Sequence, residues 1–170
     1  STGGSESGDV SYNMLVTVRF REVQRTPLNL PALRRALDAI VERHEVLRTR
    51  FVAVDGEPRQ RIEADLQAPF AAIDLSAIDP GRFEPAVAEL TERLLRRPFD
   101  LSRDAMLRAA LVLGAEDHRV VLTMHHIASD GWSIGVLLHE LSILYAAFRD
   151  DPQGASPLPP LDLQYVDVAR

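Results

Sequence analysis

Two adjacent histidines, His125 and His126, end an apolar run and are followed by the pair Asp130-Gly131. An imidazole with an unperturbed pKa of about 6.5 can take a proton from an amine or an alcohol at neutral pH. An aspartate at this spacing can cap the next helix or pair with an arginine, and a glycine after it can adopt a positive φ in a tight turn. The stretch MHHIASDGWS (124–133) is therefore the candidate site for chemistry.

The elements around the pair predict how its side chains point. Residues 120–124 are apolar or β-branched and predict a buried strand. Successive side chains of a strand point to opposite faces, so one imidazole should pack into the fold and the other should face a cavity or solvent. That geometry disfavours a metal site made by the pair, because two ligands of one metal need the same face. A structural pair, with Asp130 as a helix cap, is the alternative that these residues leave open.

The composition excludes several classes of chemistry. The chain has no cysteine, and all 19 of its basic residues are arginine, so disulfides, thiolate ligands and lysine Schiff bases are impossible. A net charge of −6 gives no electrostatic reason to expect nucleic acid or an anionic membrane as a partner. No apolar run approaches the roughly 18 residues of a membrane span, and the N-terminus does not resemble a signal peptide, so we expect a cytoplasmic protein.

The chain has 170 residues, of which 46% are hydrophobic, which is enough for one domain with a substantial core. Hydrophobic periodicity predicts strands in 10–22 and 68–75, hairpins in 49–63 and 106–126, and helices in 28–51, 84–100 and 133–150. Hairpins without strict strand–helix alternation favour an α+β fold, with a mixed or antiparallel sheet packed with helices. Residues 1–10 are rich in glycine and serine, and we expect a flexible lead-in there.

Local signals give further detail for four of these elements. Asn29 and Ser133 are placed to cap the first and the last helix. Asp55-Gly56 is typical of a two-residue hairpin turn. The buried side of the middle helix is expected to carry four apolar residues: Val87, Leu90, Leu94 and Leu95.

Taken together, these motifs resemble the condensation domains of nonribosomal peptide synthetases. The stretch 124–133 is similar to their HHxxxDG signature, RHEVLRTRF (43–51) to their RHExLRTxF motif, and YVDVA (165–169) to the start of YxDxAxW. Softer similarities are SYNM before the first strand, PFDLS after the middle helix and ELSILY in the last helix. The resemblance runs from about residue 11 to the C-terminus.

The resemblance implies a chloramphenicol acetyltransferase-like fold, with two lobes around a tunnel that carrier-bound donor and acceptor enter from opposite ends. It implies that 11–170 is the N-terminal lobe, with the family's first helix and second lobe absent. In such domains the acceptor amine attacks the donor thioester and a peptide bond forms. The expected partners are donor and acceptor peptidyl carrier proteins and the neighbouring synthetase domains. No cofactor or metal would bind directly, because phosphopantetheine arrives on the carriers.

The resemblance also assigns roles within the signature. His126 would reach the reaction centre, where it positions or deprotonates the acceptor amine, while His125 would support the fold. Asp130 would have a structural role through an arginine pair, and Gly131 would let the backbone approach the substrate. Two further residues would line or brace the active-site loop: Trp132 and Ser133. In the RHEVLRTRF motif, Arg43, Glu45 and Arg48 are assigned to architecture.

Two alternatives to amide formation remain. The paired histidines and Trp132-Ser133 favour amide formation over the heterocyclising and epimerising relatives, but a relative that acylates an alcohol shares HxxxD. A non-catalytic docking or recruiting domain of the same fold is the other alternative, although such domains tend to lose the second histidine or the glycine. Because half a tunnel cannot hold two reactants in register, we expect these 170 residues alone to be inactive and to self-associate through exposed apolar surface.

Overall fold

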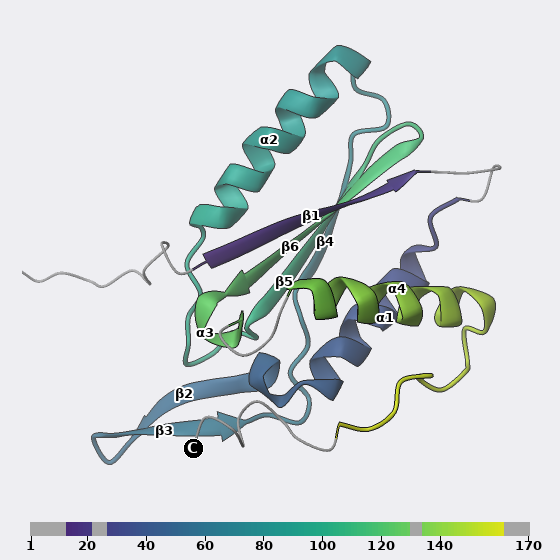
Figure 1. Ribbon diagram of the computed structural model, residues 1–170. Coiled ribbons are helices and arrows are strands. Elements are labelled where there is room, and N and C mark those ends of the chain that lie inside the picture. Colours follow the sequence, from purple (N-terminus) through teal and green to yellow (C-terminus); the bar gives the residue numbers. More distant parts are fainter. Residues whose placement is uncertain (1–12, 22–26, 130–133, 162–170) are drawn as a thin grey trace, which may run out of the picture.

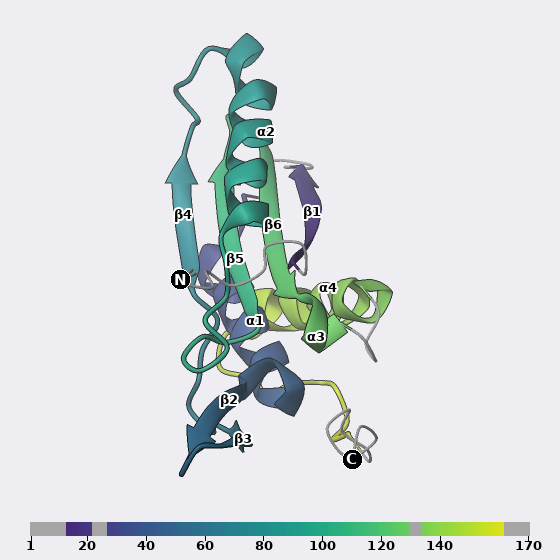
Figure 2. The same cartoon turned by 90° about the vertical axis from the view of Figure 1, so that its left-hand side faces the viewer.

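The computed structural model describes residues 13–21, 27–129 and 134–161, and Figures 1 and 2 show a sheet with helices on both of its faces. The elements in chain order are β1 (Asn13–Arg21), α1 (Leu30–Arg43), the 3-10 turn η2 (Glu45–Arg48), β2 (Thr49–Val54), β3 (Glu57–Ile62), β4 (Phe70–Asp74), α2 (Pro80–Arg96), β5 (Leu107–Leu113), β6 (Asp117–His125), α3 (His126–Ser129) and α4 (Ile134–Asp150). The predicted lead-in, residues 1–10, lies outside the described residues.

The main sheet has the order β1-β6-β5-β4. β6 pairs antiparallel with β1 and with β5, whereas β4 runs parallel to β5. The sheet is therefore mixed, which confirms the predicted α+β class. β6 lies between two strands, and its residues from His118 to Met124 are all buried. The strand that leads into the candidate site is thus held along nearly its whole length.

One face of the sheet carries the core, formed with the adjoining helices α1 and α4. The apolar residues of α1 that periodicity places on one face are buried in this cluster: Ala32, Leu33, Ala36, Leu37, Ile40 and Val41. Alternate residues of β6, such as Val120, Leu122 and Met124, are buried there as well. Asn29 caps α1 as predicted, because its side-chain oxygen accepts a hydrogen bond of 3.0 Å from the N–H of Ala32. The N–H of Asn29 donates to the hydroxyl of Tyr145 on α4 at 3.0 Å, which ties the two helices together.

α2 lies across the other face of the sheet (Figure 2). It begins at Pro80, earlier than predicted, because the side chain of Asp79 accepts from the N–H of Gly81 and caps it. Val87 is buried as expected, but Leu95 is 38% exposed, so its assignment to the buried side was wrong. Leu95 lies in the last turn of the helix, where none of the described elements covers it from outside.

The long first helix predicted over 28–51 ends earlier, at Arg43. The guanidinium of Arg48 turns back and donates to the carbonyls of Val41 and Glu42, which lie in the last turn of the helix and have no intrahelical donor. Residues 49–51, which the helix and hairpin predictions shared, belong to strand β2. This strand pairs with β3 across the expected turn at Asp55 and Gly56, both at positive φ. The hairpin predicted over 49–63 is confirmed, and its strand pairing overrides helical periodicity over 49–51.

No helix among the described ranges is long and apolar enough to cross a membrane.

Candidate active site

The histidine pair lies at a change of secondary structure. His125 is the last residue of β6 and His126 is the first residue of α3, a single helical turn. We predicted that the alternation of side chains along a strand would separate the two imidazoles. That explanation was wrong, because the strand ends at His125 and His126 already belongs to a helix. The two side chains still differ in environment: that of His125 is half-buried and that of His126 is exposed. The start of a helix separates them, rather than the pleat of a strand.

His125 is held through both its backbone and its ring. Its N–H donates to the carbonyl of Met106 at 3.1 Å, and its Nδ1 accepts from the N–H of Ile127 at 3.1 Å. Since Nδ1 is an acceptor, the neutral ring carries its proton on Nε2. The ring also meets that of Phe99 edge-on, with centroids 5.8 Å apart and planes at 86°. His125 therefore has a defined tautomer and a defined orientation.

Burial is the main reason why the pKa of His125 lies below its ordinary value, and the neighbouring charge of His126 lowers it further. At neutral pH the His125 ring is accordingly neutral. A neutral ring fits a supporting role, because its acceptor nitrogen keeps the hydrogen bond to Ile127 only while it is unprotonated.

His126 stands on an anchored turn. Ala128, two residues later in α3, is fully buried, whereas Ile127 and His126 are exposed. The small side chain of Ala128 lets the turn pack against the core and leaves the imidazole of His126 accessible. An accessible imidazole at the end of a rigid strand can meet an incoming nucleophile.

The rest of the signature, Asp130, Gly131, Trp132 and Ser133, lies outside the described residues. The predicted arginine pair of Asp130 and the predicted cap by Ser133 therefore stay predictions, as does the approach of substrate to Gly131. α4 begins directly after this segment, at Ile134. Within the described ranges, no group of three or more histidine, aspartate or glutamate side chains is arranged to hold a metal ion.

The RHEVLRTRF motif forms a joint between α1 and α4. Glu140 of α4, only 6% exposed, accepts from Nε of Arg43 at 2.9 Å and lies 2.7 Å from Nε2 of His44. Burial lowers the pKa of His44, although the nearby carboxylate of Glu140 opposes that effect. The motif also bonds internally, because the hydroxyl of Thr49 donates to the carbonyl of Glu45. These contacts are architectural, as predicted for Arg43, Glu45 and Arg48.

Sequence reasoning missed one residue of the joint between α1 and α4 and a group of residues beside His125. Glu140 was not singled out, although ELSILY, the segment that contains it, was noted as a similarity. Asn13 of β1, Phe99 of the segment after α2 and Arg108 of β5 lie around His125, and only the PFDLS similarity pointed to one of them. Arg108 interrupts the otherwise apolar sequence LRAALVL (107–113), and a charged residue in such a stretch could have drawn attention to it.

Comparison with known proteins identifies the class. The family model for the condensation domain matches residues 4–170. The chain belongs to the condensation domain family, whose members in nonribosomal peptide synthetases form peptide bonds. This agrees with the resemblance carried by the three sequence motifs.

Several synthetases are similar over most of this chain. A polypeptide of the linear gramicidin synthase of Brevibacillus parabrevis is 45% identical over 84% of the chain and 3% of its own length. Phosphinothricin tripeptide synthetase PhsC of Streptomyces viridochromogenes is 41% identical over 96% of the chain and 15% of its own length. Beauvericin nonribosomal cyclodepsipeptide synthetase of Beauveria bassiana is 42% identical over 95% of the chain and 5% of its own length. The chain thus spans only a small part of these relatives.

Solved structures agree with the fold. The first condensation domain of the calcium-dependent antibiotic synthetase, in complex with a substrate analogue, gives a TM-score of 0.74 at 27% identity, over 92% of this chain and 36% of that one. The X-domain of teicoplanin biosynthesis, in complex with OxyB, gives a TM-score of 0.78 at 29% identity, over 98% of this chain and 34% of that one. This chain therefore corresponds to about one third of each of these longer relatives.

Proposed function

We propose that this chain forms the N-terminal lobe of a condensation domain that joins a carrier-bound donor thioester to a carrier-bound acceptor amine. The observation that carries the proposal is the split between the two histidines: His125 is fixed and neutral, while His126 is accessible on an anchored turn. An enzyme needs one accessible group at the reacting atoms and a rigid support behind it. The reaction we propose is the one that condensation domains carry out in nonribosomal peptide synthetases.

In the proposed step, the acceptor nitrogen attacks the donor carbonyl carbon. A C–N bond forms, the C–S bond breaks, and the amine loses a proton that the departing thiolate finally receives. His126 either holds the amine in line or carries that proton. A free amine and a thioester already react readily, so positioning is the larger contribution and proton transfer the smaller one.

The partners follow from the same proposal. Donor and acceptor peptidyl carrier proteins would present their substrates on phosphopantetheine arms, so no diffusible cofactor is needed. The second lobe would complete the tunnel, and the protein would act in the cytoplasm beside the other synthetase domains. Asp130 and Gly131 would shape the loop that follows His126, with Trp132 and Ser133 lining or bracing it.

Acylation of an alcohol is a second candidate, since one relative, 42% identical, is a cyclodepsipeptide synthetase, and depsipeptides contain ester bonds. Recruitment of another protein is a third, because one structural neighbour is an X-domain in complex with OxyB. Both candidates keep the fold. Acylation of an alcohol changes the acceptor that reaches His126, whereas recruitment changes the protein that binds the outer surface.

The test uses the complete domain that contains these residues. One carrier is loaded with a donor aminoacyl thioester, and a second carries either an amino or a hydroxy acceptor. Intact-protein mass spectrometry follows the donor mass onto the acceptor carrier for the wild type, H126A and the control H139A, which removes an exposed histidine of α4. We expect transfer to the amine, a loss of about 100-fold in H126A and no loss in H139A.

Transfer only to the hydroxy acceptor would replace amide formation by ester formation. Binding of carriers or of another protein without transfer to either acceptor would replace both by recruitment. Equal losses in H126A and H139A would contradict a special role for His126.

A further inference from the structure

The end of the sheet that holds His125 carries two buried polar side chains on the same face. Asn13 of β1 lies directly opposite His125, and Arg108 of β5 lies opposite Thr123, two residues before His125 on β6. Side chains opposite one another, or two residues apart on one strand, share a face. Asn13 is 8% exposed and Arg108 is 6% exposed. Burying such a polar side chain costs free energy unless it forms hydrogen bonds.

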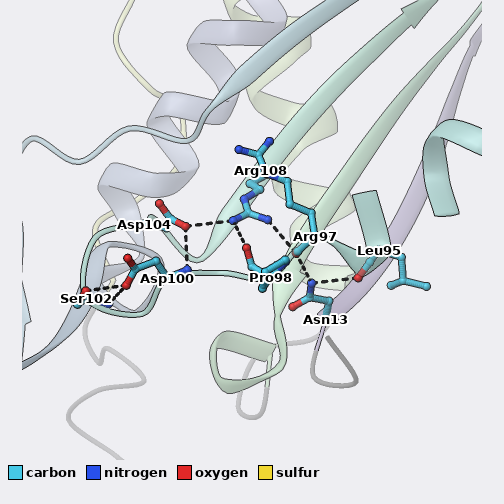
Figure 3. Close-up of polar contacts among 8 residues, drawn as sticks. All are labelled: Asn13, Leu95, Arg97, Pro98, Asp100, Ser102, Asp104 and Arg108. Carbon is cyan, nitrogen blue, oxygen red and sulfur yellow. Dashed lines mark hydrogen bonds and ion pairs between the residues drawn. The ribbon is translucent and has the colours of Figure 1, made fainter. Parts of the chain in front are cut away.

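Their partners are the backbone carbonyls at the end of α2 and just beyond it (Figure 3). The Nδ2 of Asn13 donates to the carbonyls of Leu95 at 3.0 Å and Arg97 at 2.7 Å. Arg108 donates to the same Arg97 carbonyl at 3.0 Å and to that of Pro98 at 2.6 Å. Residues 95–99, which we call the clamp segment, are therefore fastened to the sheet from both sides of His125.

The last residue of the clamp segment, Phe99, lies between Arg108 and His125. The guanidinium carbon of Arg108 is 3.8 Å from the centre of the Phe99 ring, within the range of a cation–π interaction. The same ring meets the imidazole of His125 edge-on. The Phe99 side chain is buried, at 4% exposed. Phe99 thus contacts both the guanidinium of Arg108 and the imidazole of His125.

Arg108 is itself held by Asp104, whose carboxylate accepts from its Nη2 at 3.0 Å. Asp104 also accepts from the N–H of Asp100 at 2.9 Å, which orients the carboxylate (Figure 3). Only a planar guanidinium can donate to two carbonyls and a carboxylate while its face covers an aromatic ring. A lysine at this position would keep the charge and lose that geometry.

Open space lies beside the clamp segment. A cavity of about 520 Å³ is lined by residues 97–99 of the clamp segment, by the loop after them and by Arg108. Because Phe99 lines this cavity, its ring has room to move once the guanidinium no longer covers it. A displaced Phe99 would release the edge of the His125 imidazole.

We propose that Arg108 is a positioning residue for the histidine pair, acting through Phe99 on the ring of His125 and so on the turn that begins at His126. The positioning itself rests only on the contacts above, whereas its catalytic consequence rests on the proposed function. Arg108 touches neither substrate nor reacting atoms in this role.

The first test reads the imidazole directly. Five histidines of the complete domain lie in this chain, and long-range ¹H–¹⁵N spectra of the complete domain, labelled with ¹⁵N-histidine, distinguish the two neutral tautomers of each ring. In the wild type, His125 should show its proton on Nε2. R108K conserves the charge. In this variant we expect the His125 ring to exchange between its two neutral tautomers and its signals to lose the ring-current shift caused by Phe99. The signals of histidines outside the site should stay unchanged.

Arg119 provides the matched control. It is 7% exposed, projects from the same face of β6, pairs with Asp117 and Glu84, and lies over the ring of Phe83. It is six residues from His125 on the same strand, a distance of about 20 Å. R119K should therefore leave the His125 signals unchanged. Equal perturbation of His125 by R108K and R119K, or none by R108K, would overturn the proposal.

A milder variant covers the case in which R108K does not fold. Asp104 has a side chain that is 35% exposed, so D104N should fold and should loosen Arg108 without removing it. The proposal requires D104N to shift the His125 tautomer in the direction expected for R108K. A fully native His125 spectrum in D104N would count against it.

The second test measures carrier-to-carrier transfer in the complete domain. R108K should lower kcat by about tenfold or more, because misplacement of a positioned group by about 1 Å suffices for such losses, with KM changed less than about threefold. R119K should keep kcat. If the wild type transfers nothing, the proposed function fails, and the NMR comparison still decides whether Arg108 positions His125.

Discussion

The backbone N–H of Ile127 donates a hydrogen bond of 3.1 Å to Nδ1 of His125, joining the last residue of β6 to the second residue of α3. The bond closes the junction at which the chain changes from strand to helix. It also fixes which nitrogen of His125 carries the proton. His126 lies between the two bonded residues, so its backbone is held from both sides.

This bond predicts an order of stability among substitutions of His125. In H125N, the side-chain oxygen can take the place of Nδ1 and accept from Ile127, whereas H125L leaves that N–H without its partner. We expect H125L to lower the free energy of unfolding by about 1 kcal/mol more than H125N does. Urea unfolding followed by circular dichroism measures the difference. Equal values for the two variants would mean that the bond contributes nothing to stability.

The buried histidine of the α1–α4 joint predicts a pH dependence. Burial lowers the pKa of His44 below its ordinary value in the folded chain, while Glu140 and Arg43 are the charged groups beside it. Below about pH 6.5 the unfolded chain therefore binds more protons than the folded one, so the free energy of unfolding falls as the pH falls.

We expect H44Q to reduce this loss of stability between about pH 7.5 and about pH 5.5. The control H139Q removes an exposed histidine of α4 and should keep the wild-type slope. Urea unfolding at the two pH values gives the comparison. A wild type that becomes more stable on acidification would refute the direction stated for His44.

Glu140 joins two helices, and its loss should be costly. In E140A, His44 and Arg43 lose the carboxylate that both contact, and a buried polar cluster keeps only part of its partners. We expect a loss of about 3 kcal/mol in the free energy of unfolding. The control E92A breaks an exposed pair with Arg96 on α2 and should cost less than about 0.5 kcal/mol. Comparable losses in the two variants would show that the joint is not a buried ion cluster.

The β5–β6 turn predicts a steric cost at Gly114. A Cβ there would lie 2.2 Å from the carbonyl oxygen of Asp117 and 3.0 Å from Phe83. At Gly56, in the β2–β3 turn, a Cβ would meet nothing within 4 Å, and the cost comes only from its φ of +77°. We expect G56A to cost about 1 kcal/mol and G114A about 2 kcal/mol or more. Denaturant midpoints compare the two, and the reverse order would mean that the β5–β6 turn relaxes freely.

Local sequence signals predicted most of the elements of this protein. The cap at Asn29, the turn at Asp55-Gly56 and the apolar stripe of α1 each depend on residues within a few positions of one another, so periodicity and turn chemistry suffice for them. The motif spacing similarly led to the correct family, because three ordered motifs are a property of the chain itself. The apolar run over 120–124 is also a local signal, and it correctly predicted that the histidine pair lies at the end of a strand.

Strand pairing decided what local patterns could not. Residues 49–51 belonged both to the helix predicted over 28–51 and to the hairpin predicted over 49–63, and the pairing of β2 with β3 decides for the hairpin. The parallel contact of β4 with β5 is likewise decided by how distant strands meet in the sheet.

The sequence by itself determined the residue types at the site, the local elements that carry them and the family. Only the tertiary structure placed Glu140 against His44, 96 residues apart, and brought Arg108 and Phe99 to His125. Such contacts link side chains that are distant in sequence, and no local spacing encodes them. The physical reason is that caps and turns are satisfied by neighbouring backbone, whereas a buried charge or ring must find its partner wherever the folded sheet and helices bring one within reach.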